Sequence, residues 1–250
     1  MMNNTINSLL LHRSFRSYHD KAVEDEKLDN IIRAVQAAPN WCNIQHVSII
    51  VIKDNKCRQR MVELCGGQLY IAQAPVFLVF CADYYRTFLA CRKHGENLDD
   101  IMQDIDHLII GANEVGIALG TAVVAAESQG LGTVPIGDVR MNALALIQEL
   151  KLPRYVVPQL GLCVGYPDQD PDLKPRLPKQ AVCFEEQYDT DLERSLDEYD
   201  VVYEKYLRKR PWNNRVSNWT QLVADFYKAP YNHYPETARM LKQQGFIVKD

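Results

Sequence analysis

The sequence lacks the short motifs by which most catalytic classes are detected. It has no G-x-S-x-G, G-x-x-x-x-G-K-[ST] or H-E-x-x-H motif, and no G-x-G-x-x-G follows an expected strand. His94 with Glu96, and His107 with Asp104, do not have a metal-binding spacing, so we interpret both pairs as surface residues. The direct evidence for a serine hydrolase, a P-loop kinase, a zinc enzyme or a Rossmann dehydrogenase is therefore missing, and we expect no metal.

Paired cysteines are also lacking. The chain has 7 cysteines, an odd number, and no C-x-x-C pair. A disulfide framework or a zinc site is not expected from this spacing. Cys42 is the one cysteine in a polar, loop-like setting. It is either a reactive thiol or a bystander near a ligand site, and we favour the bystander.

Long hydrophobic runs and an excess of basic charge are absent as well. We find no apolar run of membrane-spanning length, and residues 1–7 lack the features of a signal peptide, so we expect a cytoplasmic protein without a membrane partner. The formal net charge of -4 argues against a general nucleic-acid binder. With 250 residues, 47% of them hydrophobic, the chain can form a large core in one domain, or in one domain with an appendage.

Helices and strands alternate in the first three quarters of the chain. Residues 24–39 place apolar side chains on one helical stripe, with acids in the first turn and Pro39 at the end. Segments rich in apolar, β-branched or aromatic residues predict strands. We expect strands at 47–54, 74–83, 133–137 and 155–167, and further helices at 5–11, 55–65, 107–132 and 138–153. The helix at 107–132 is small and apolar on nearly every face, which predicts burial all round and favours a subunit interface.

The character of the chain changes near Asp189. Residues 189–210 form an amphipathic pattern, two shorter helices are expected at 219–228 and 237–244, and Pro211 and Pro230 are the expected joints. We therefore predict an α+β fold, with a small central sheet flanked by helices and a C-terminal helical arm. The expected division is a core of 1–188 and an arm of 189–250.

Cations gather in two short stretches of this acidic chain. "LHRSFRSYHD" contains His12, Arg13, Ser14 and Arg16, and "LKPRLP" places Lys174 and Arg176 on alternate positions of an extended segment. Guanidinium groups and a hydroxyl suit a phosphate, whereas the competing interpretation is a pair of solvated surfaces. Either stretch alone is weak evidence for a ligand site, and the pair is stronger evidence.

Several stretches in this order resemble the flavin-dependent nitroreductase superfamily. They are "HRSFR", "GGQLYIAQAPVFLVFCAD", "AAESQGLGTVPIGDVR", "LPRYVVPQLGLCVGYPDQDPDLKPRLP" and "NNRVSNW", and they extend from His12 to Trp219. More narrowly, the chain is similar to the oxygen-insensitive NADPH nitroreductase and NADPH–flavin reductase group. The stretch "GLCVGYP…DLKPRLP" is the most specific of the matches.

This resemblance implies an intertwined homodimer with one FMN in each of two interfacial sites. It also implies ping-pong, two-electron transfer from NADPH to nitroaromatics, quinones, azo compounds or free flavin. Electrostatic catalysis falls to Arg16, near the N1/O2 edge of the flavin, and no protein nucleophile is expected. Arg210 is the implied contact for the NADPH 2′-phosphate. The implied FMN-binding residues are His12, Arg13, Ser14, Arg16, Asn40, Cys42, Gln45, Gln68, Tyr70, Pro135, Ile136, Gly137, Asp138, Lys174 and Arg176.

The resemblance implies different roles for different members of this FMN-binding set. Arg13, Lys174 and Arg176 would neutralise the 5′-phosphate, and Gln68 would hydrogen-bond the pyrimidine edge. Ile136 and Gly137 would place a backbone N–H at flavin N5. The loop that carries Asn40, Cys42 and Gln45 would come from the partner subunit.

Four positions depart from the pattern of the group. The group commonly has an aromatic residue at Pro135 and a second glycine at Asp138, and it often has serine at Asn40 and Cys42. Asn40 can still act as a hydrogen-bonding partner, so FMN binding is expected to survive. Asp138 would bring a carboxylate close to the ring, which would disfavour anionic substrates.

Two other functions remain open from the sequence. A flavin-binding storage or sensor module would keep the fold and the FMN with little turnover. A non-flavin scaffold with solvated basic residues would be colourless. The oxidoreductase is favoured over both.

Overall fold

The computed structural model describes residues 3–210, 213–228 and 233–246. The chain divides into two compact units, Met1–Pro171 with His233–Asp250, and Asp172–Asn232. The expected domains, 1–188 and 189–250, stay a prediction. Pro211 and Pro230, the expected joints of the arm, lie outside the described residues.

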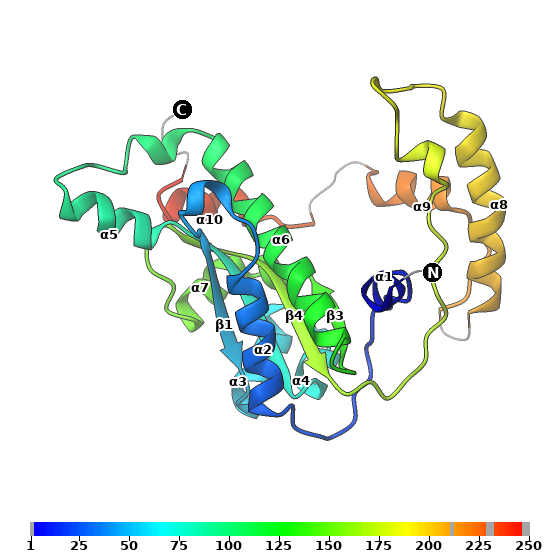
Figure 1. The fold of residues 1–250 in the computed structure, drawn as a ribbon, viewed down its shortest axis with the longest axis horizontal. Coiled ribbons are helices and arrows are strands. Elements are labelled where there is room, and N and C mark those ends of the chain that lie inside the picture. Colours follow the sequence, from blue (N-terminus) through cyan, green and yellow to red (C-terminus); the bar gives the residue numbers. More distant parts are fainter. Residues whose placement is uncertain (1–2, 211–212, 229–232, 247–250) are drawn as a thin grey trace. The chain divides into compact units, whose positions relative to one another are not determined.

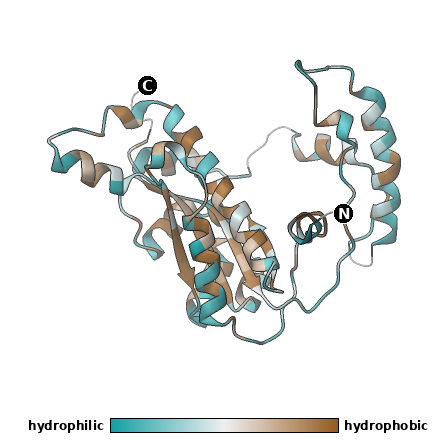
Figure 2. Ribbon diagram, in the orientation of Figure 1, coloured by the Kyte–Doolittle hydropathy of each residue, from teal (hydrophilic) through white to brown (hydrophobic). Residues whose placement is uncertain are grey.

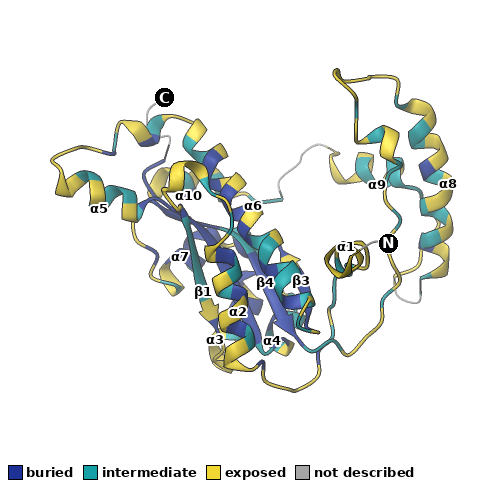
Figure 3. Cartoon of the chain, in the orientation of Figure 1, coloured by how far each residue is buried: buried dark blue, intermediate teal, exposed yellow. Residues whose placement is uncertain are grey.

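A four-stranded antiparallel sheet with the order β1-β2-β4-β3 forms the centre of the first unit (Figure 1). Its strands are β1 (Val47–Ile52), β2 (Val76–Asp83), β3 (Gly132–Ile136) and β4 (Val156–Gly165). Every residue of β2 is buried, because its sequence is apolar on both faces and helices cover the sheet (Figure 3). The four expected strands and the α+β class are confirmed by this arrangement.

Helices cover both faces of this sheet. Figure 1 shows α2 (Asp25–Gln36) and α6 (Asp106–Glu127) in front of it, and α3 (Asn55–Leu64) and α7 (Ala143–Glu149) behind it. The expected stripe of α2 is confirmed, since Leu28, Ile31 and Val35 are its buried residues. The unit also contains α1 (Asn4–Leu10), α4 (Tyr70–Gln73), α5 (Tyr85–Lys93) and α10 (Thr237–Gln243).

Helix α6 bears on two expectations. Ile109 and Ile117 are exposed on a face that the described residues leave uncovered, so burial all round would need a subunit interface, which stays a prediction. By length and composition the helix is also able to cross a membrane, whereas no such run was expected. The core helix of a soluble protein has the same composition, and α6 packs with its other face on all four strands (Figure 2).

The second unit consists of an extended segment followed by α8 (Glu193–Lys209) and α9 (Trp219–Phe226). The two helices pack together, and Asp200 of α8 accepts a hydrogen bond of 2.9 Å from the backbone N–H of Thr220. Asn218 caps α9 by accepting from the backbone N–H of Gln221. The helices expected at 189–210 and 219–228 are therefore present, with α8 beginning four residues later than expected.

Candidate functional site

Residues 12–16 lie along the outer edge of strand β3. The backbone N–H of Phe15 donates to the carbonyl of Thr133 at 2.9 Å, and Ser14 forms a parallel bridge with the same residue. A Cβ at Gly132 would lie 2.7 Å from the Phe15 ring, so this close approach requires a glycine. His12 is held to the end of α6 by Glu127, with 2.7 Å between Nδ1 and Oε1.

Arg13 has one hydrogen-bonding group in use and one buried group without a partner. Its Nη1 contacts the carboxylate of Asp170, whose side chain is 86% exposed. Its Nε is buried and has no hydrogen-bond partner among the described residues. A buried donor of this kind is costly unless an acceptor arrives, so Arg13 is suited to bind an anion.

Four of the expected site residues form one continuous polar network. The guanidinium of Arg16 lies 5.9 Å from the ring centroid of Tyr70, and the Tyr70 hydroxyl donates to Oε1 of Gln68. Nε2 of Gln68 in turn donates to Oδ2 of Asp138. Burial raises the pKa of Tyr70, and the positive charge of Arg16 offsets part of that rise. We call these four residues the Asp138 network.

Tyr234 and His233 complete this network, and sequence reasoning missed both. The Tyr234 hydroxyl donates to Oδ1 of Asp138 at 3.1 Å, and His233 Nε2 lies 3.6 Å from the same oxygen. A Cβ at Gly137 would lie 2.7 Å from the Tyr234 hydroxyl. The segment that precedes α10 therefore covers the turn after β3. No motif marked these residues, because their position depends on a return of the chain over about 95 residues.

The neighbouring residues of β3 are placed as an edge strand requires. Pro135 is exposed and Ile136 is buried. Proline has no N–H to donate, so it is tolerated on an edge strand where that position is not needed for the ladder. Gly137 and Asp138 follow directly, at the start of a short 3-10 helix, Asp138–Arg140.

The loop with Asn40, Cys42 and Gln45 is held by a buried acid on α6. Oε1 and Oε2 of Glu114 accept from the backbone N–H groups of Trp41 (3.0 Å) and His46 (2.8 Å), and Oε1 is 3.0 Å from His46 Nδ1. Glu114 is only 4% exposed. One feature of the sequence could have indicated this role, since Glu114 is the one charged residue between Leu108 and Ala126.

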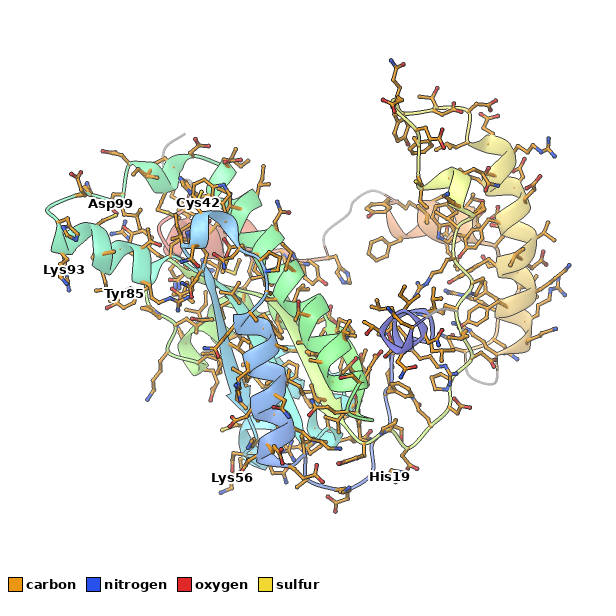
Figure 4. The ribbon with its side chains drawn as sticks, viewed as in Figure 1. His19, Cys42, Lys56, Tyr85, Lys93 and Asp99 are labelled. Atoms are coloured by element: carbon orange, nitrogen blue, oxygen red, sulfur yellow. The ribbon has the colours of Figure 1, made fainter. Side chains whose placement is uncertain are left out.

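Within one chain, this loop and His12 are held to different parts of α6. The loop is anchored at Glu114, whereas His12 is anchored at Glu127, and 13 helical residues span about 20 Å. Figure 4 shows Cys42 and His19 at opposite ends of the first unit. Cys42 is exposed, and its φ of 50° places it in the left-handed region.

A pocket of about 420 Å³ lies at the loop end of the sheet, between α2, β1 and α6. Asn40, Gln45, Arg86 and Glu114 are among its polar lining residues. The residues of the Asp138 network do not line it. We identify the candidate site by the network and by Arg13, because those residues combine charge, burial and an unpartnered donor.

Three expected site residues lie in the second unit. Lys174 and Arg176 flank Pro175, whose carbonyl accepts a hydrogen bond of 2.8 Å from the Tyr199 hydroxyl of α8. Arg210 follows the last residue of α8, and its Nε donates to the carbonyl of Asn213 at 2.8 Å. Their approach to the first unit stays a prediction.

Comparison with known proteins decides the family. The model of the nitroreductase family matches residues 10–166, and the model of its C-terminal domain matches residues 174–249. The chain belongs to the nitroreductase family. The resemblance inferred from the sequence motifs is thereby confirmed.

Relatives and solved structures match this nitroreductase over nearly its whole length. It is 45% identical to "FMN reductase [NAD(P)H]" of Bacillus subtilis, across 99% of this chain and 100% of the relative. It is 38% identical to "NADPH-flavin oxidoreductase" of Vibrio harveyi, across 89% of this chain and 90% of the relative. The structure of NfrA2 from B. megaterium matches with a TM-score of 0.95, at 42% identity and with 100% of both chains covered. The predicted nitroreductase-like fold is confirmed.

Proposed function

We propose that this nitroreductase is an FMN-dependent NADPH oxidoreductase that reduces small-molecule acceptors such as nitroaromatics, quinones, azo compounds or free flavin. The observation that carries the proposal is the Asp138 network, which joins Arg16, Gln68, Tyr70 and Asp138 in space. The resemblance assigned all four residues to one flavin. The names of the Bacillus and Vibrio relatives support the same activity.

The residues present fit a flavin phosphate and ring. The buried Nε of Arg13 lacks an acceptor, and a phosphate oxygen would supply one. The competing partner of Arg13, Asp170, is largely exposed, so its ion pair is weak and can be displaced. His12, Ser14, Ile136 and Gly137 would surround the ring from neighbouring backbone segments.

Bound FMN would supply hydride chemistry, and the chain would supply orientation and charge. Arg16 is the residue whose fixed positive charge would stabilise the reduced ring. Arg16→Ala should therefore lower the rate of flavin reduction by NADPH about 100-fold, with a smaller loss of flavin content. Stopped-flow absorbance at the flavin band measures that rate. Loss of flavin with an unchanged rate in the remaining holoenzyme would exchange the roles given to Arg13 and Arg16.

The proposal includes a homodimer in which one chain completes the site of the other. The loop with Asn40, Cys42 and Gln45 is anchored about 20 Å along α6 from the anchor of His12, so a partner subunit is needed to bring it to the flavin. Lys174 and Arg176 would bind the same phosphate as Arg13. Arg210 would bind the NADPH 2′-phosphate, and the enzyme would work in the cytoplasm, where NADPH is available.

Anaerobic titration tests this function against its alternatives. The purified protein should be yellow, with about one FMN per chain. NADPH should bleach it, and a quinone should restore the colour within the turnover time. A yellow protein that NADPH does not bleach would support a flavin storage or sensor module instead. A colourless protein that takes up no FMN would contradict both.

A further inference from the structure

Asp138 presents a carboxylate that is held from several sides. Its Oδ2 accepts from Nε2 of Gln68, and its Oδ1 accepts from the Tyr234 hydroxyl at 3.1 Å. A Cβ at Gly66 would lie 2.9 Å from Oδ2, so the backbone passes directly beside the carboxylate. The side chain of Asp138 is 20% exposed. The negative charge is therefore fixed in position and still faces solvent.

A titratable imidazole and two guanidinium groups lie around this carboxylate. His233 Nε2 lies 3.6 Å from Oδ1, and the guanidinium of Arg140 lies 4.4 Å from the ring centroid of Tyr234. Arg16 reaches the network at its other end, through Tyr70. Burial and the charge of Asp138 raise the pKa of Tyr234, so its hydroxyl stays protonated and donates at neutral pH. Asp138 is the residue that directly follows Gly137 in the chain, so its carboxylate lies next to that backbone position.

We propose that Asp138 is a specificity-determining residue that selects electron acceptors by charge. An acceptor that approaches Gly137 meets the carboxylate of Asp138, so a neutral acceptor is admitted and an anionic acceptor is repelled. This inference rests on the proposed function, because it takes Gly137 to lie at the reacting edge of the flavin. At about 6 Å and an effective dielectric constant of about 50, allowing for exposure, one charge on the acceptor changes kcat/KM about fivefold to tenfold.

Two quinones that differ in charge provide the test. The reaction is quinone + NADPH + H⁺ → hydroquinone + NADP⁺, so two electrons and two protons are accounted for. The neutral acceptor is 2-methyl-1,4-naphthoquinone, and the anionic acceptor is 1,4-naphthoquinone-2-sulfonate. The measured quantity is the ratio of kcat/KM for the anionic acceptor to kcat/KM for the neutral one. Each value is expressed per bound flavin, so a change in flavin content does not affect the ratio.

Three substitutions separate charge from position. Asp138→Asn should raise the anionic-to-neutral ratio at least about fivefold. Asp138→Glu keeps the charge and should keep the ratio within about twofold. Asp29→Asn makes the same change of charge at an exposed position on α2, and should leave the ratio unchanged. An unchanged ratio in Asp138→Asn, in an enzyme that still turns over, overturns the inference alone.

The wild-type enzyme gives a second readout that needs no variant at Asp138. Raising the ionic strength from about 10 mM to about 500 mM shortens the screening length, so the anionic-to-neutral ratio should rise. A ratio that falls with salt overturns the inference even if Asp138→Asn does not fold. If the wild-type enzyme reduces neither quinone with NADPH, the proposed function fails and the inference fails with it. These two failures are distinguished by the rate with the neutral quinone.

Discussion

The guanidinium of Arg13 has one exposed partner, a carboxylate, and one buried donor that lacks an acceptor. Its contact with Asp170 lies in solvent, whereas its Nε is buried without a partner. Hydrogen bonds to charged groups are worth about 1.5–3 kcal/mol, and a buried donor that gains an anion is favoured further. The Arg13 side chain can therefore bind an anion more strongly than it binds the exposed carboxylate of Asp170.

Arg13→Ala should raise the dissociation constant of FMN about 10-fold to 100-fold, because it removes one charged phosphate contact. Fluorescence titration of the apoprotein with FMN measures this constant. Asp170→Asn is the matched control, since it frees Arg13 without removing it, and FMN should bind at least as tightly as in the wild type. Unchanged FMN affinity in Arg13→Ala would remove this residue from the phosphate site.

The sequence motifs predict four residues of the candidate site, and their binding of a flavin stays a prediction. Arg16, Gln68, Tyr70 and Asp138 were predicted because each lies in a recognisable motif, and the structure places them together. Tyr234 lies in no such motif. Its contact with Asp138 spans 96 residues and depends on where the chain returns to the first unit, which a local pattern does not encode.

The loop between α2 and β1 is an element shaped by strained backbone and one buried acid. Cys42, Asn43 and Gln45 have φ values of 50°, 57° and 64°, which non-glycine residues adopt at a cost. Glu114 offsets that cost by accepting from the backbone at both ends of the loop. The conformation of the loop therefore depends on a residue outside it.

Glu114→Gln should lower the free energy of unfolding by about 1–3 kcal/mol, because an amide NH₂ replaces one of two acceptor oxygens that face buried donors. Urea unfolding followed by circular dichroism measures the loss. Glu26→Gln makes the same chemical change at an exposed position on α2, and it should stay within about 0.5 kcal/mol of the wild type. Equal stability of the two variants would contradict the anchoring role.

The end of α8 carries the expected coenzyme contact. Arg210→Ala should raise KM for NADPH about 10-fold and leave KM for NADH nearly unchanged, because the 2′-phosphate is the group that distinguishes the two coenzymes. Initial-rate kinetics with both coenzymes measure the difference, which added salt should reduce. Arg208→Ala removes the same charge two residues earlier, where Arg208 pairs with Glu204, and should change neither KM. Equal effects of Arg210→Ala on both coenzymes would remove it from the site.

Helices and strands with a strong local hydrophobic pattern were predicted from the sequence. Features that depend on tertiary packing were not. The apolar stripe of α2, its acidic first turn and the apolar strands β2 and β4 are all readable from residue order. Helix α5 was missed because its sequence, YRTFLACRK, has no residue buried in this chain and so no marked stripe. Helix α6 was predicted as a helix, but an apolar sequence does not tell a face against the sheet from a face left uncovered.

At the scale of the whole molecule, the second face of α6 is not covered by the described residues of the first unit. Ile109 and Ile117 are exposed there, and a Cβ at Gly116 would meet nothing within 4 Å in its own chain. Exposed apolar surface on a helix of this composition is typical of a subunit interface. The proposed dimer would cover it.

Gly116→Leu should convert the dimer to a monomer without lowering the stability of the chain, because the added side chain fits the isolated chain and blocks close approach of a partner. Sedimentation velocity measures the change, and flavin content should fall with it if each site needs both subunits. Lys56→Leu adds the same side chain to an exposed position of α3 and should leave the dimer intact. A Gly116→Leu protein that stays dimeric would place the interface elsewhere.

The segment from His12 to Arg16 also has a role at the rim of the sheet. It lies on the outer edge of β3, where Phe15 and Ser14 engage the backbone of Thr133. An uncovered strand edge is a template for pairing with other chains, and proteins protect such edges. A deletion of these residues would therefore do more than remove cations. It would open β3 to aggregation, so this stretch is constrained by solubility as well as by chemistry.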